Sequence, residues 1–110
     1  RVVMCSGKVY YDLLAAVGAD QSIALVRCEL LYPWPASPMA ALRARYGKAE
    51  FVWCQEEPAN MGAWTFVRDR FDWAARAMRP AAASPATGSL VRHKAEQAAL
   101  VDKALGRAPA

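Results

Sequence analysis

The chain has 110 residues, of which 55% are hydrophobic and 22% charged, a balance typical of one packed domain with a single modest core. The net charge of +4 is spread along the chain without a basic block, which argues against a nucleic-acid-binding arm. No apolar run reaches the roughly 18 residues that span a bilayer, and no signal-peptide pattern opens the chain, so we expect no membrane role.

The chain begins with a strand pattern followed by a helix pattern. Residues 1–5 form a short, apolar, β-branched run, which predicts a buried strand. Because the chain opens directly inside this strand, we expect it to be a fragment of a longer protein. Ser6 is the expected N-cap of the next helix, whose apolar positions recur from Val9 and which ends near Gly18.

Two more strands follow, with a helix between them. Residues 23–27 and 50–55 predict these strands, and Ser37-Pro38 predicts the start of the intervening helix. The proline-containing segment 30–35 predicts a loop pinned to the core, and Pro58 is expected to stop the third strand. Strands that alternate with helices predict βαβ units and a parallel sheet.

A long helix is predicted from about residue 60 onward. Its stripe comprises Trp64, Val67, Phe71 and Met78. Asp72 and Arg76 have the spacing of a helical ion pair. Phe66 and Trp73 fall on a second face, which predicts contact with another domain or subunit.

The last third of the chain predicts a loop, a helix and a tail. Residues 79–88 are rich in Pro, Ala and Ser, as extended loops are. Residues 89–105 predict a helix, and residues 106–110 a frayed tail. The inward positions of that helix are predicted to be Val91, Ala95, Ala98 and Leu105.

The three cysteines, Cys5, Cys28 and Cys54, are far apart in sequence and lie in or beside apolar runs. This pattern favours buried free thiols in a reducing compartment. A zinc site is not expected, because its ligands would be closely paired and the chain has a single histidine.

Two short segments carry the candidate chemistry. Ser6-Gly7-Lys8 is compatible with an ordinary capped turn or with an anion-binding helix start, although it lacks the glycines of a phosphate-binding loop. Gln55-Glu56-Glu57 offers adjacent carboxylates, but neighbours on an extended segment point to opposite sides, which disfavours a catalytic dyad. We expect these carboxylates to pair with Lys8 or an arginine, or to act at an interface. His93 has no predicted Ser or Cys partner, so we expect a local contact.

Three segments in order resemble a known family. They are residues 1–13, residues 53–58 with Asn60 and 62–64, and residues 82–88 with His93. Over residues 1–105 the chain resembles the 2-oxoglutarate dehydrogenase family. The resemblance is to the C-terminal domain of the first component of that enzyme, which carries out the thiamine-diphosphate-dependent decarboxylation.

The resemblance implies a fold. It is a three-layer α/β/α domain of the transketolase C-terminal type with a mainly parallel sheet, in which the strand at 1–5 lies between those at 23–27 and 51–55. A switch in strand order would then open a crevice between Ser6-Gly7-Lys8 and Gln55-Glu56-Glu57. Departures from the family pattern before residue 82 and before Arg1 predict about three strands with two unprotected edges.

The resemblance also implies a function. The family decarboxylates 2-oxoglutarate in the tricarboxylic acid cycle and transfers the succinyl group to the lipoyl arm of a succinyltransferase component. Thiamine diphosphate and Mg²⁺ are held by upstream domains, so this chain is expected to bind no cofactor and no metal and to contain no catalytic residue. Its expected role is structural, within a homodimer located in the bacterial cytoplasm or, in a eukaryote, the mitochondrial matrix.

Interface or ligand-crevice residues are predicted to be Ser6, Gly7, Lys8, Gln55, Glu56, Glu57, Asn60, Trp64, Trp73 and His93.

One alternative to this structural role is a regulatory module that binds an anionic nucleotide or acetyl-coenzyme A in the crevice by Ser6 and Glu56. Another is a non-functional truncated product. Saturable heat on adding acetyl-coenzyme A, AMP or ADP distinguishes the first alternative, and the lack of a cooperative melt distinguishes the second.

Overall fold

Four parallel strands form the centre of the molecule. The computed structural model describes residues 1–83 and 89–107. The strand order is β2-β1-β3-β4, so β1 lies between β2 and β3 as the family resemblance implies. The strands are β1 (Val2–Cys5), β2 (Ala24–Arg27), β3 (Phe51–Pro58) and β4 (Ala75–Arg79).

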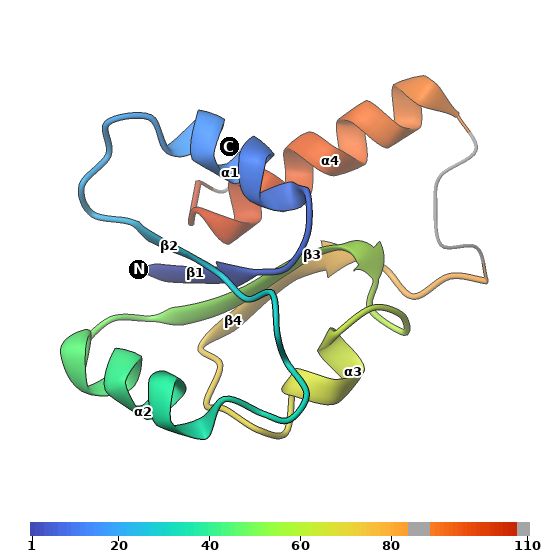
Figure 1. Ribbon diagram of the computed structural model, residues 1–110. Helices are drawn as coiled ribbons and strands as arrows, with labels where there is room; N and C mark the ends of the chain where they lie inside the picture. Colours follow the sequence, from blue (N-terminus) through green and yellow to red (C-terminus); the bar gives the residue numbers. More distant parts are fainter. Residues whose placement is uncertain (84–88, 108–110) are drawn as a thin grey trace.

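Helices cover both faces of this sheet, which confirms the α/β class and the three layers (Figure 1). The helices are α1 (Val9–Val17), α2 (Ala36–Arg45), α3 (Trp64–Val67) and α4 (Leu90–Ala104). Helices α1 and α4 lie on one face, and α2 and α3 on the other. Since β1 connects to β2 and β2 then connects across to β3, the carboxyl ends of β1 and β3 form a topological switch point.

The long helix predicted from residue 60 to Met78 is wrong. Only residues 64–67 are helical there, and residues 75–79 form β4, which pairs with β3. Ala, Arg and Met favour helices in isolation, but pairing with β3 satisfies the backbone and overrides that preference. The expected pair between Asp72 and Arg76 is therefore not formed, and Arg76 lies over the Trp64 ring instead.

The expectation of about three strands is corrected by the same observation. Because β4 is hydrogen-bonded to the outer side of β3, the sheet has four strands and its edges are β2 and β4. The additional strand is formed by residues that the helix prediction covered. All strand pairs are parallel.

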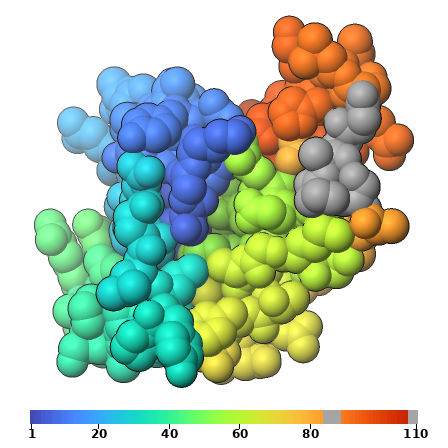
Figure 2. All heavy atoms as spheres, turned by 45° about the vertical axis from the view of Figure 1, so that its right-hand side comes forward, coloured from blue at the N-terminus to red at the C-terminus, as the bar shows by residue number. Residues whose placement is uncertain are grey.

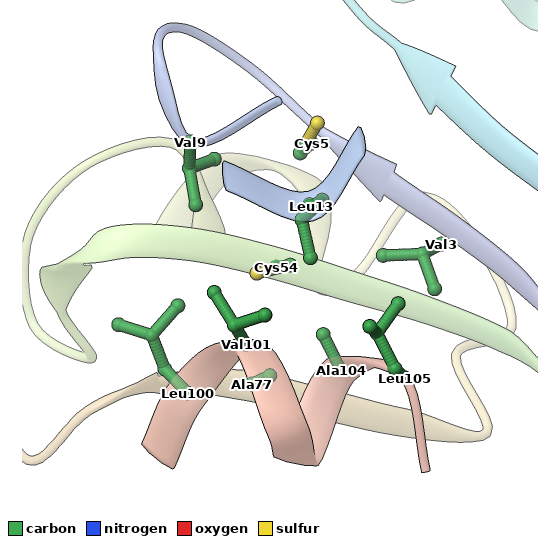
Figure 3. Close-up of a cluster of buried hydrophobic side chains, with 10 residues drawn as sticks. All are labelled: Val3, Cys5, Val9, Leu13, Cys54, Ala77, Leu100, Val101, Ala104 and Leu105. Carbon is green, nitrogen blue, oxygen red and sulfur yellow. The ribbon is translucent and has the colours of Figure 1, made fainter. Parts of the chain in front are cut away.

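Two apolar cores lie on opposite faces of the sheet. The core under α1 and α4 is shown in Figure 3 and contains Val3, Cys5, Val9, Leu13, Cys54, Ala77, Leu100, Val101, Ala104 and Leu105. The core under α2 and α3 contains Val2, Met4, Met39, Phe51, Trp53, Trp64 and Val67. Successive residues of β1 and β3 alternate between the two, as the pleat of a strand requires.

Some element ends differ from the predictions. Ser6 is not the N-cap of α1, because Lys8 occupies that position and makes no side-chain capping bond. Gly18 does end α1, with φ of 56°. Helix α2 starts at Ala36 rather than at Ser37, and the loop before it packs Leu31 and Trp34 against the core, as predicted.

The inward face of α4 was predicted incorrectly in its first half. Val91 is 79% exposed, and Ala95 and Ala98 are also exposed, whereas Leu105 is buried. The face turned to the sheet begins with polar residues, which a search for apolar periodicity does not detect. Of the predicted tail, Arg107 bonds to the backbone oxygen of Ala16 at 2.6 Å, and residues 108–110 lie outside the described residues.

Candidate functional site

The two segments with candidate chemistry meet at the carboxyl edge of the sheet. Cys5 and Cys54 are in register on β1 and β3, so the residues that follow them emerge side by side. Lys8 Nζ donates to Glu56 Oε1 at 2.8 Å, which confirms the expected pairing. In Figure 2 the start of α1, the segment after β2, the turn after β3 and α3 all lie on this face.

Glu56 is held on the α1 and α4 side of the sheet. Its side chain is 16% exposed, and Oε1 also accepts from Gln97 Nε2 at 2.8 Å. The hydrogen bond to Glu56, together with its negative charge, raises the pKa of Lys8. Gln97 Nε2 also donates to Asp12 Oδ2 at 2.7 Å, so this glutamine links α4 to α1 and β3.

Arg79 is the buried cation of the site, and sequence reasoning placed it in a loop. It is only 6% exposed. Its guanidinium donates to the backbone oxygen of Glu56 at 2.6 Å and to Gln97 Oε1 at 2.8 Å, and it lies 3.3 Å from His93 Nδ1. Its Nε is 3.2 Å from Glu96 Oε2, an ion pair without good hydrogen-bond geometry. Ala77 and Arg79 are the buried residues of β4, but the local sequence carries no signal that distinguishes this arginine from the exposed Arg76.

Gln55 is buried and fully occupied by internal hydrogen bonds. Its Oε1 accepts from Trp53 Nε1 at 3.0 Å and from the Trp64 backbone N–H at 2.8 Å. Its Nε2 donates to the backbone oxygens of Glu57, Pro58 and Met61. The amide therefore fixes the turn between β3 and α3.

Glu57 lies away from Glu56. A Cβ added at Gly62 would meet Glu57 Oε2 at 2.5 Å, which places this carboxylate beside the turn before α3. Glu56 is bonded to Gln97 on the opposite side of the sheet. The two carboxylates do not form a dyad, as the alternation of an extended strand predicts.

The other predicted site residues are dispersed around this edge. Asn60 exchanges hydrogen bonds with the backbone of Ala82, at 2.9 and 3.0 Å, and so ties down the start of the segment predicted to be a loop. Residues 84–88 of that segment lie outside the described residues. Trp64 is buried, and Trp73 packs on Trp53 with ring centroids 5.6 Å apart. His93 Nδ1 lies 3.3 Å from the guanidinium of Arg79 on β4, so its contact joins α4 to the sheet and is not the local helix or loop contact that was expected.

The cysteines are free, as predicted. Cys5 and Cys54 are buried and Cys28 is half-buried. Burial raises the pKa of Cys5 to about 12 and that of Cys28 to about 11, and it also raises the pKa of Cys54. Such thiols are poor nucleophiles at neutral pH.

A groove of about 440 Å³ runs between α1 and α4. Asp12, His93, Lys94, Gln97 and Asp102 supply its polar lining. Over residues 1–83 and 89–107, no group of three His, Cys, Asp or Glu residues is arranged to hold a metal ion. Within the same residues, no helix is long and apolar enough to cross a membrane.

Comparison with known proteins gives consistent results. The family model described as "2-oxoglutarate dehydrogenase C-terminal" matches residues 1–105. The "2-oxoglutarate dehydrogenase E1 component" of Brucella anthropi is 48% identical over 120 residues, which cover 96% of this chain and 12% of that protein. The proteins of the same description from Brucella ovis and Brucella canis show the same identity and coverage. The chain thus spans about an eighth of the length of these relatives.

Proposed function

This chain belongs to the 2-oxoglutarate dehydrogenase C-terminal family, and we propose that it is the C-terminal structural and dimerisation domain of an E1 component. The parent enzyme decarboxylates 2-oxoglutarate in the tricarboxylic acid cycle and passes the succinyl group to a lipoyl-bearing component. The chain alone has no activity. The family's transketolase C-terminal fold and a location in the cytoplasm of a bacterium belong to the same proposal.

One observation carries the structural role: the polar groups at the switch point are used by the domain itself. Gln55 makes five internal hydrogen bonds, and Glu56 is held by Lys8 and Gln97. A catalytic group has to be free to exchange protons or bonds with a substrate. Because the polar groups of this site already have internal partners, the site supports a structural role at a contact between domains of a larger enzyme better than a catalytic role.

The residues at positions 1–83 and 89–107 do not fit thiamine diphosphate and Mg²⁺. A metal-bound diphosphate requires several oxygen ligands around the ion, and the described residues contain no such cluster. In this proposal the cofactor and metal belong to the remaining length of the parent. No catalytic step is assigned to this chain.

The surface most suited to contact other parts of the parent is the turn after β3 with the segment from Trp64 to Trp73. Glu57 lies near the end of β3, next to this turn, is half-exposed and makes no side-chain hydrogen bond or ion pair within the described residues. A half-exposed carboxylate without an internal partner is available to a cation on another body.

A chimera tests this proposal. The matching segment of the Brucella anthropi E1 component is replaced by this chain, and dimerisation and 2-oxoglutarate decarboxylation are measured with thiamine diphosphate and Mg²⁺. We expect an active dimer, with no turnover from the 110-residue chain alone. Turnover by the chain alone, or a folded but monomeric and inactive chimera, would overturn the proposal.

Two charge reversals on β3 or next to it refine the test. Glu57→Lys in the chimera should weaken assembly, because it places a cation at the proposed contact. Glu50→Lys is the matched control at the opposite end of the strand, where Glu50 makes an ion pair with Arg1 at 3.0 Å. Equal effects of the two variants would argue against the surface around Glu57.

A second candidate function is a regulatory module that binds an anionic nucleotide or acetyl-coenzyme A. The observation in its favour is the Ser6-Gly7-Lys8 turn at the start of α1, in which Gly7 is exposed and the Lys8 side chain is 75% exposed. The Glu56 carboxylate beside Lys8 opposes an anion there. Calorimetry with acetyl-coenzyme A, AMP and ADP separates the two functions, because the structural role predicts no saturable heat.

A further inference from the structure

Helix α4 is attached to the domain in two different ways along its length. From Leu100 onward its inward residues are buried in the core with α1. No residue of α4 before Leu100 is buried, and Leu90 and Val91 are 69% and 79% exposed. Figure 1 shows that the first turns of α4 lie farther from the sheet than the last turns.

Polar contacts join this first half to the rest of the domain. Within the described residues, Arg79 on β4 contacts His93, Glu96 and Gln97. Gln97 in addition reaches Glu56 on β3 and Asp12 on α1. The contacts therefore converge on one buried guanidinium and one glutamine.

Contacts of this kind come apart at lower cost than a packed core. Separation of the two surfaces returns Arg79 and Glu96 to water, which recovers the hydration that they lost on burial. Separation at Leu100 and Val101 would instead expose apolar surface, at the full hydrophobic cost. The two halves of α4 therefore belong to segments of different local stability.

We propose that residues 90–99 form a lid, latched by Arg79, that opens without unfolding the domain and controls access to the Glu56 carboxylate. When the lid is closed, Gln97 lies on Glu56 Oε1 and the Glu56 side chain is 16% exposed. When it is open, Gln97 leaves, and the Glu56 carboxylate faces solvent or a partner together with Lys8 and Asp12, which are exposed in both arrangements. The lid is a property of this chain and holds whether or not the proposed function is correct.

Native-state hydrogen exchange on the 110-residue chain, read by peptide mass spectrometry, tests the lid. In the wild type we expect amides of 93–99 to be at least tenfold less protected than those of 100–104. Arg79→Met should lower protection of 93–99 at least tenfold further, relative to 100–104 and to β1 and β3. The readout is the ratio of amide protection between residues 93–99 and residues 100–104. A general loss of stability lowers protection in both segments and leaves this ratio unchanged.

Arg92→Met is the matched control. Arg92 also forms an ion pair with Glu96, at 3.4 Å, but it does so from within α4 and is 74% exposed. Its loss leaves the link to the sheet intact, so the protection ratio should stay within about twofold of the wild type.

Gln97→Ala is a second variant, which leaves the buried charge of Arg79 in place. It too should lower the amide protection of residues 93–99 more than that of residues 100–104. Equal protection of 93–99 and 100–104 in the wild type and both latch variants would overturn the proposal. So would a loss of protection in Gln97→Ala that is equal in β1, β3 and both halves of α4.

Discussion

The side-chain oxygen of Gln55 accepts a hydrogen bond from the backbone N–H of Trp64 at 2.8 Å. This bond fastens the first turn of α3 to the carboxyl end of β3, nine residues earlier in the chain. Gln55 is 2% exposed, so the bond is made in the interior, where an unpaired amide group is costly. Gln55 was predicted to contact a ligand or an interface, but its side chain instead stabilises the turn between Glu57 and Trp64.

Gln55→Leu should lower the free energy of unfolding by about 2–4 kcal/mol. The substitution leaves Trp53 Nε1, the Trp64 N–H and the backbone oxygen of Met61 without their present partner. Urea denaturation followed by tryptophan fluorescence measures the change. Glu57→Gln is the control and should change stability by less than about 0.5 kcal/mol, because this half-exposed side chain has no hydrogen-bond or ion-pair partner among the described residues. Similar losses in both variants would contradict the structural role of Gln55.

The Lys8–Glu56 pair should contribute modestly and in a pH-dependent way. Because Lys8 is 75% exposed, a double-mutant cycle with Lys8→Met and Glu56→Gln should give a coupling energy of about 0.5–1 kcal/mol. The folded-state pKa of Lys8 is raised above its ordinary 10.5. The contribution is therefore fully present below that pH and is lost as the pH rises through the raised pKa.

Melting curves between neutral and strongly alkaline pH measure this loss. The wild type should approach Lys8→Met in stability at the alkaline end, whereas cysteine ionisation affects both proteins alike. A constant difference between them across the whole range would show that the ion pair does not contribute.

Native cysteines should resist alkylation. With the pKa of Cys28 raised to about 11, its thiolate fraction at pH 8 is small, and iodoacetamide should react at least tenfold more slowly than with a free thiol. Cys5 and Cys54 should react only after unfolding, because they are buried as well. Mass spectrometry with and without urea counts the modified thiols, and rapid native labelling of Cys54 would contradict the buried placement.

Trp73→Ala should cost about 2–3 kcal/mol of stability. The ring packs at 5.6 Å from Trp53 and 5.0 Å from Phe71, and its Nε1 donates to the Val67 backbone oxygen at 3.0 Å. Tyr32→Ala is the matched control, since Tyr32 is 79% exposed and contacts one ring, that of Phe66. Thermal unfolding of both variants gives the comparison; a Trp73→Ala protein as stable as Tyr32→Ala would indicate that Trp73 does not support the fold.

Local patterns were sufficient for the elements whose burial is continuous. Residues 1–5, 23–27 and 50–55 were expected as strands because their apolar character suits a sheet covered on both faces, and strands lie at all three places. The end of α1 followed from Gly18, and the helix predicted over residues 89–105 corresponds to α4. The pairing of Glu56 with Lys8 was one of the expected outcomes, since Lys8 or an arginine was predicted to pair with the adjacent carboxylates.

The sequence by itself thus determined the family, the parallel α/β class and the edge at which the candidate residues meet, because these depend on short apolar runs and on the residues that end them. Tertiary structure alone decided the strand state of Ala75–Arg79, whose residues prefer a helix until β3 supplies hydrogen-bond partners. It also decided the burial of Gln55 and Arg79. A polar side chain enters the interior only where donors and acceptors from distant segments converge on it, and that convergence has no signature in the local sequence.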